Sequence, residues 1–295
     1  ANKTNELFAD FIKPEFTYIY ADSNINYTNK TLTVEFSVTD KYFSKVNLTT
    51  AQMASQITIG IQGENTAINS KVTKTVTKIS DVTETRSGTS VKIGEKYRLV
   101  IGNLQQSTTA GKYRDYSGPM QIMFPKDMVV DKSGNGNNAQ TITIGINYQG
   151  ETNVDESEGK VVDVVNPEWK VQNINVDRTN KKVTVDIVGT DKYYKSNSLD
   201  VSKIKVLVDG EETTGILKEL SGATYLTERR NGANVRYGVS YTLTLTGFEQ
   251  AEIKSGKKYL DWSGNTSLKI KAGTLSDEHN SNLEQTLSLG EIDLV

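Results

Sequence analysis

Aspartates recur at corresponding places in the two halves of the sequence, and their spacing points to metal chemistry. They are Asp10, Asp40 and Asp131 in the first half and Asp163, Asp191 and Asp277 in the second. In a seven-strand sandwich with alternating strand direction, the start of the first strand, the loop after the second and the loop before the last share one end. Three carboxylates meeting there could contribute to the about six to eight oxygen ligands that Ca²⁺ takes.

A simpler interpretation of the same aspartates is that each one caps its own loop through local hydrogen bonds to the backbone. The segment 131–135, Asp-Lys-Ser-Gly-Asn, also lacks the carboxylate spacing and the closing glutamate of an EF-hand loop. Both interpretations stay open from the sequence. Calcium is the one candidate cofactor, and no other is expected.

The sequence contains few residues of the types that usually carry out catalysis. The chain has no cysteine and one histidine, His279, in a polar stretch of the second half. Paired carboxylates could serve a glycosidase, but a small sandwich offers no evident deep cleft. No phosphate loop or dinucleotide fingerprint occurs. We therefore expect the chain not to be an enzyme.

An aromatic turn, Tyr-x-Asp-Tyr/Trp-Ser-Gly, occurs once in each half. It carries Tyr113 and Tyr116 in the first half and Tyr259 and Trp262 in the second. A tyrosine at a corner between two strands of a β-sandwich can tie the loop to its own backbone. Tyr and Trp are also frequent binding hot spots. The structural role is favoured, and partner binding is the alternative.

Lysines alternate with Thr and Val between Lys71 and Lys78, which is typical of a charged edge strand. Lys74 and Lys78 could block aggregation at such an edge. The same strand could accept a strand from a partner protein. The sequence leaves both open.

Composition excludes several classes of protein. The chain has 295 residues with 34 Lys and Arg against 36 Asp and Glu, so a basic surplus for nucleic-acid binding is absent. No apolar run has the length of about 20 residues that a membrane helix needs. Tyr, Thr, Val, Gly and Asn are abundant, which favours strands and turns. We expect two domains, all-β, that act as a monomer without membrane insertion.

An internal repeat is the strongest organisational signal. The matching segments are 10–16 with 163–169, 29–36 with 180–187, 39–43 with 190–194 and 113–118 with 259–264. The order is the same in both halves and the offset changes by only a few residues. The sequence therefore predicts two copies of one module, at 1–146 and 161–295, joined by an acidic linker at 147–160.

Seven strands are predicted in each module from period-two alternation of apolar residues. In the first they cover 15–20, 31–39, 56–62, 71–80, 95–103, 119–125 and 140–146. Short alternating strands separated by turns predict a Greek-key β-sandwich in each module.

Three features together resemble the immunoglobulin-like repeats of gram-positive cell-surface proteins. They are Asp10 four residues before Pro14, Asp40 after the second strand, and the segment 131–135 before the last strand. The second copy departs from this pattern, with Asp-Glu-His-Asn at 277–280. The resemblance implies an extracellular, cell-wall associated or secreted segment, cut at module borders from a longer protein.

The resemblance implies two functions. One is binding of a host extracellular protein, as an adhesin does. An antibody is a candidate, because some immunoglobulin-binding, superantigen-like surface proteins of gut commensals are similar in their paired modules. The alternative is a stalk that projects another domain. A binder should concentrate its differences between copies on one surface, and the most divergent stretches are 66–94 and 213–234.

Overall fold

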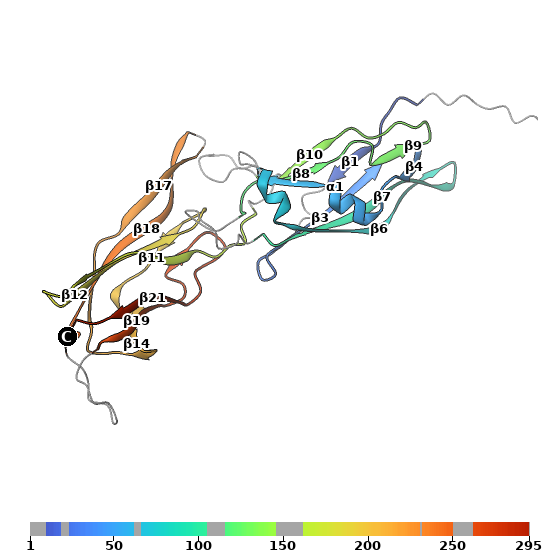
Figure 1. The fold of residues 1–295 in the computed structure, drawn as a ribbon. Helices are drawn as coiled ribbons and strands as arrows, with labels where there is room; N and C mark the ends of the chain where they lie inside the picture. The colour runs from blue at the N-terminus through green and yellow to red at the C-terminus, as the bar shows by residue number, and fades with distance from the viewer. Residues whose placement is uncertain are drawn as a thin grey trace, which may run out of the picture. The chain divides into compact units, whose positions relative to one another are not determined.

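The computed structural model describes residues 10–18, 24–61, 66–104, 116–145, 162–230, 232–249 and 262–294 (Figure 1). The chain forms two compact units, residues 1–106 with 116–165, and residues 107–115 with 166–295. The expected linker at 147–160 lies outside the described residues. Residues 162–165, expected to open the second module, belong to the first unit by their contacts. No helix in the described ranges is long and apolar enough to cross a membrane.

In its described residues, the first unit contains three sheets and one short helix. Its elements are β1 (Glu15–Tyr18), β2 (Asn24–Asn26), β3 (Thr31–Thr39), β4 (Phe43–Val46), α1 (Thr50–Gln56), β5 (Thr58–Ile61), the 3-10 turn η2 (Thr66–Ser70), β6 (Thr73–Arg86), β7 (Thr89–Gly102), β8 (Met120–Phe124), β9 (Val129–Asp131) and β10 (Gln140–Ile144). The large sheet has the order β1-β3-β7-β6, with β2 also on β3. The order β10-β8-β5 forms the second sheet, and β4 pairs with β9.

Alternation along β3 builds the core of this unit. Leu32, Val34, Phe36 and Val38 are buried on one face of the strand, as the period of two predicts. The Phe36 ring lies 4.8 Å from the ring of Phe124 on β8, so the two sheets pack on one another.

The second unit has the same three kinds of sheet, and its counterpart of the three-stranded sheet β10-β8-β5 has four strands. Its elements are β11 (Glu168–Asp177), β12 (Lys182–Thr190), β13 (Ser196–Asn197), the 3-10 turn η4 (Val201–Lys203), β14 (Ile204–Val208), β15 (Glu211–Glu212), β16 (Leu217–Leu220), β17 (Thr224–Arg230), β18 (Ala233–Thr246), β19 (Gly264–Ile270), β20 (Leu275–Ser276) and β21 (Gln285–Ile292). The sheet orders are β11-β12-β18-β16 with β17 on β18, β15-β14-β19-β21, and β13-β20.

The prediction of an all-β chain is confirmed, and the predicted strands of the first module all have counterparts. The largest difference is that β6 and β7 have 14 residues each and form one long hairpin across the expected loop at 81–94. The tight turn at Ser87 and Gly88, both with positive φ, joins the two strands.

The helix α1 was not predicted. The Thr49 hydroxyl accepts from the Gln52 amide, and the Thr49 amide donates to the Gln52 side-chain oxygen, which completes a capping box. Met53 is its buried residue. A helix this short has too little apolar periodicity to be seen in the sequence, although the Thr-x-x-Gln spacing is a usable signal.

Candidate functional site

Asp10, Asp40 and Asp131 meet in the first unit, as the sequence predicted. One carboxylate oxygen from each lies within 4.8 Å of the others. Asp10 precedes β1, Asp40 follows β3, and Asp131 ends β9. Asp40 and Asp131 are buried, with 7% and 2% of their surface exposed.

Each of these aspartates also caps its own loop. The Asp40 carboxylate accepts a hydrogen bond from the Tyr42 amide at 2.6 Å, and that of Asp10 accepts one from the Ile12 amide at 3.0 Å. Asp131 accepts from the amide and side chain of Asn135. Local capping and clustering therefore occur together, and the two sequence interpretations do not exclude each other.

The electrostatics of this acidic cluster are unfavourable for three ionised carboxylates. Burial raises the pKa of Asp40, and the nearby charges of Asp10 and Asp131 raise it further, against the lowering effect of the Tyr42 hydrogen bond. Among the described residues, Asp10 Oδ2 has no hydrogen-bond partner. The chemistry of the cluster, acceptor-only oxygens with few donors, is compatible with a hard cation.

The remaining three predicted aspartates belong to different units. Asp191 and Asp277 lie in the second unit, where Asp191 accepts from the Tyr193 amide at 2.7 Å and Asp277 accepts from the amides of His279 and Asn280. Burial raises the pKa of Asp277. Asp163 belongs to the first unit, where the Ser117 hydroxyl donates to it at 2.9 Å.

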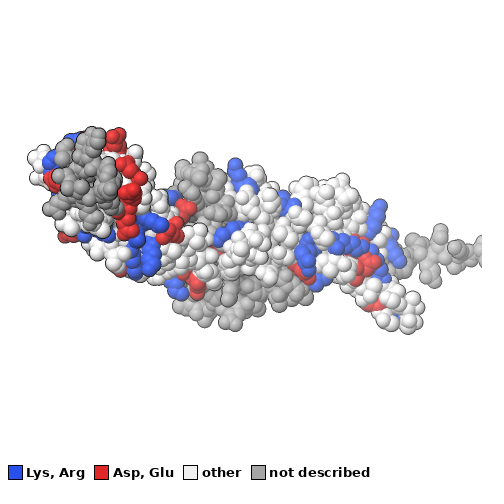
Figure 2. Space-filling view, turned by 90° about the horizontal axis from the view of Figure 1, so that it is seen from below, with Lys and Arg blue, Asp and Glu red and all other residues white. Residues whose placement is uncertain are grey.

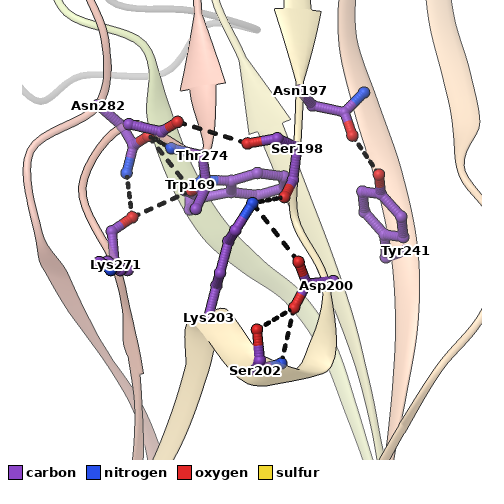
Figure 3. A network of polar contacts seen from close by, with 11 residues as sticks. Trp169, Asn197, Ser198, Asp200, Ser202, Lys203, Tyr241, Lys271, Thr274 and Asn282 are labelled. Atoms are coloured by element: carbon purple, nitrogen blue, oxygen red, sulfur yellow. Dashed lines mark hydrogen bonds and ion pairs between the residues drawn. The ribbon is translucent and has the colours of Figure 1, made fainter.

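A buried asparagine, which the sequence analysis missed, holds each aspartate loop. In the second unit the Asn282 side chain accepts from the amides of Thr274 and Leu275 and donates to the carbonyl oxygen of Lys271 (Figure 3). In the first unit Asn137 accepts from the Val129 amide in the same way. The signal available in the sequence was an Asn a few residues before the last strand of each module.

Figure 3 also places the Trp169 indole against this loop, where its N–H donates to the Thr274 hydroxyl at 2.9 Å. Trp169 has 1% of its surface exposed. The first strand of the second unit and the loop before its last strand are thus fixed to each other through buried polar groups.

The aromatic turn is internal wherever the structure describes it. Trp262 is 4% exposed and belongs to the core of the second unit, and its amide donates to the Phe248 carbonyl oxygen at 2.8 Å. Tyr116 packs against the core of the first unit, with its amide donating to Leu104. These contacts agree with the structural interpretation. Tyr113 and Tyr259 lie outside the described residues.

The two candidate lysines of the edge strand differ in environment. The Lys74 side chain is half-buried and donates to the Ile57 carbonyl oxygen and to Asn69, and burial lowers its pKa. Lys218 makes the same bond to the Ile204 carbonyl oxygen. Lys78 is exposed and its pKa is raised by ion pairs with Asp81 at 2.7 Å and Glu95 at 2.8 Å.

The tip of the long hairpin has a similar sequence in both copies, although it lies within the stretches 66–94 and 213–234 that were expected to be the most divergent. Thr-Glu-Thr-Arg-Ser-Gly at 83–88 matches Thr-Glu-Arg-Arg-Asn-Gly at 227–232. Arg86 lies over the ring of Tyr42 and donates to the Lys41 carbonyl oxygen at 2.6 Å. Arg230 does the same with Tyr193 and Lys192. The segments that differ between the copies are therefore shorter than the expected stretches 66–94 and 213–234.

One pair of positions does differ on the exposed hairpin surface. In the second unit the Arg236 guanidinium lies 4.0 Å from the ring centre of Tyr225, which is 45% exposed. By strand register, Asp81 and Lys92 hold these positions in the first unit, where they form a 2.9 Å ion pair. On the face seen in Figure 2, Asp and Glu form a band at the left of the view, and the other charged side chains lie in smaller groups of both signs.

No protein-family model matches the chain, and no curated protein matches it. Among solved structures, domains 5–6 of the S-layer protein SbsC match 88% of this chain and 89% of that chain, with 14% identity and a TM-score of 0.18. A TM-score of this size does not establish a shared fold. The relation to immunoglobulin-like surface repeats stays a prediction from the sequence.

Proposed function

We propose that the chain is a non-catalytic structural segment of an exported cell-surface protein, in which tandem immunoglobulin-like β-sandwich modules act as a spacer. The observation that carries this proposal is that both units use the same residues for internal ties. Lys74 and Lys218, Arg86 and Arg230, and Asn137 and Asn282 bond to their own backbone in equivalent places. Residues shared by the two copies in this way maintain the fold of each module, which supports a structural role.

The proposal is tested by capture with the immobilised chain of 295 residues. Mucosal secretions and purified immunoglobulins are the probes, each with and without EDTA. A spacer captures no protein at micromolar concentration in any arm. Specific, saturable capture of an antibody or another host glycoprotein would contradict it.

Host-protein binding is the second candidate, and Tyr225 with Arg236 favours it. A stacked, exposed Tyr–Arg pair is typical of binding hot spots, and it occurs in one copy only among the described residues. The sheet that carries this pair also has a hollow of about 300 Å³, lined by Leu226, Tyr237 and Thr190 among others. If capture occurs, Tyr225→Ala should abolish it. The matched variant of the first unit, Asp81→Ala, should leave it unchanged.

A further inference from the structure

Residues 162–165 are bound to the first unit by hydrogen bonds and by burial in its core. The Gly118 amide donates to the Val162 carbonyl oxygen at 2.9 Å, and the Ser117 hydroxyl donates to Asp163. Val162, Val164 and Val165 are at most 2% exposed and belong to the core of this unit. The segment is thus an integral part of the first unit, although by sequence it is the opening of the second module.

The second unit holds residues 292–294 with the same set of contacts. Gly264 pairs with Ile292, and the Ser263 hydroxyl donates to Asp293 at 3.3 Å. Ile292 and Leu294 are 1% and 2% exposed in the core of that unit. The two glycines even share their backbone conformation, with φ of 148° at Gly118 and 147° at Gly264.

The sequences of the two held segments agree. Val-Asp-Val-Val at 162–165 matches Ile-Asp-Leu-Val at 292–295. The first of these has two roles, because Asp163 both completes the first unit and stands four residues before Pro167, as Asp10 stands before Pro14. The second matches the first at the four residues that precede the Asn-Pro of the second module opening.

Phe11 and Ile12 occupy the corresponding positions at the opening of the first module, where no module end covers them in this chain. They correspond to Val164 and Val165 in the aligned module openings, yet they are 86% and 69% exposed. Both side chains are large and apolar, and they are adjacent in the sequence. Their buried counterparts identify what covers such residues, namely the end of a module of the same kind.

We infer that the end of the second unit, formed by Ser263, Gly264 and residues 292–294, is a docking end for a further module of this kind, with Asp293 as the first carboxylate of that module's acidic cluster. This inference rests on the proposed spacer function and names its structural partner. The joint is continuous: the held segment leaves one unit and becomes the first strand of the next. In each such joint, the preceding module would hold the segment through a Ser–Asp hydrogen bond and buried apolar residues.

The repeat alignment defines the test. Because Val295 corresponds to Val165, the whole chain is extended by joining Val295 directly to Asn166, so that residues 166–295 follow a second time with nothing inserted. The control carries six Gly and Ser residues at the joint. Carbodiimide labelling of carboxylates with peptide mass spectrometry then compares the internal Asp293 with the terminal Asp293 of the same molecule.

In the direct extension, the internal Asp293 should be labelled about tenfold more slowly than the terminal one, because a docked module removes it from solvent. Asp163, at 2% exposure in the present chain, is the reference for a protected carboxylate. In the control with the inserted residues, both copies of Asp293 should be labelled alike. Equal labelling of the two copies in the direct extension would overturn the inference.

Folding of the added copy is checked independently. Both tryptophans of the chain, Trp169 and Trp262, lie in 166–295 and are buried, so a folded copy doubles the near-ultraviolet tryptophan signal. A copy that folds in the control but not in the direct extension would also overturn the inference. A second direct extension, joining Val295 to Lys13 so that residues 13–165 follow, gives the same comparison with the first unit. Capture of a host protein would contradict the spacer function and leave this labelling result unaffected.

Discussion

At the scale of single residues, Asp40 shows what the acidic cluster costs the metal-free protein. Its pKa is raised above the unfolded value by burial and by Asp10 and Asp131. Between the two pKa values the folded state binds more protons, so stability falls as pH rises through this window and the penalty persists at neutral pH. Asp40→Asn keeps an oxygen that can accept from the Tyr42 amide and removes the charge.

We expect Asp40→Asn to stabilise the protein in EDTA at pH 7 by on the order of 1 kcal/mol, the size of one removed charge–charge contact. The gain should shrink as pH falls below the raised pKa of Asp40, where the wild-type carboxyl is neutral. Urea unfolding followed between pH 4 and pH 8 measures both effects. Glu15→Gln, at an exposed position of the same unit, is the control and should change little. An Asp40→Asn variant that is less stable at every pH would contradict this account.

Calcium should reverse the order of the two proteins. If the cluster of Asp10, Asp40 and Asp131 takes Ca²⁺, the ion replaces the missing donors and stabilises the folded state by mass action, about 2.7 kcal/mol at a hundredfold excess over Kd. The wild type should then gain thermal stability on adding CaCl₂, and Asp40→Asn should gain much less. Isothermal titration of the EDTA-treated chain measures the binding itself. No heat and no shift in the wild type would leave the aspartates as loop caps alone.

At the scale of elements, the long hairpins depend on their arginines. Arg86 ties the tip of β6–β7 to the loop after β3, and Arg230 ties β17–β18 in the same way. Truncation of either to Ala should cost about 1–2 kcal/mol, since a charge-assisted hydrogen bond and a stacked ring are lost together. The loss should be larger for Arg230, whose side chain is 17% exposed against 27% for Arg86.

Denaturant unfolding of the two alanine variants measures this difference, and hydrogen exchange should show faster opening at the hairpin tips. Lys in place of Arg keeps the charge but not the planar group, and should recover only part of the loss. Thr85→Ala, on the exposed side of the same tip, is the matched control. Equal stability of Arg86→Ala and wild type would show that the tip is held by strand pairing alone.

The same elements explain how far the sequence could be interpreted. The alternation of β3 and the repeat of module openings predicted the core strands and the meeting of Asp10, Asp40 and Asp131. The extension of β6 and β7 could not be predicted, because residues 77–90 are polar except for Ile79 and Val82 and are exposed on both faces, so they show no apolar alternation. The roles of Asn137 and Asn282 depend on which backbone groups the fold leaves unpaired, and only the folded chain shows these.

At the scale of the whole molecule, each unit has a hydrophobic core of its own. The core residues of the first unit and those of the second form separate clusters in the described part of the chain. Both tryptophans belong to the second cluster, so tryptophan fluorescence reports that unit alone.

Val34→Ala, at a fully buried position of the first unit, should lower the stability of that unit by about 2–3 kcal/mol because it leaves a cavity. The fluorescence midpoint should stay at the wild-type value while the far-ultraviolet transition becomes broader and begins earlier. Leu243→Ala, equally buried in the second unit, should instead shift the fluorescence midpoint. A fluorescence shift in Val34→Ala as large as that in Leu243→Ala would mean that the two units unfold in one cooperative transition. A spacer built from them would then lose its structure as a whole instead of one module at a time.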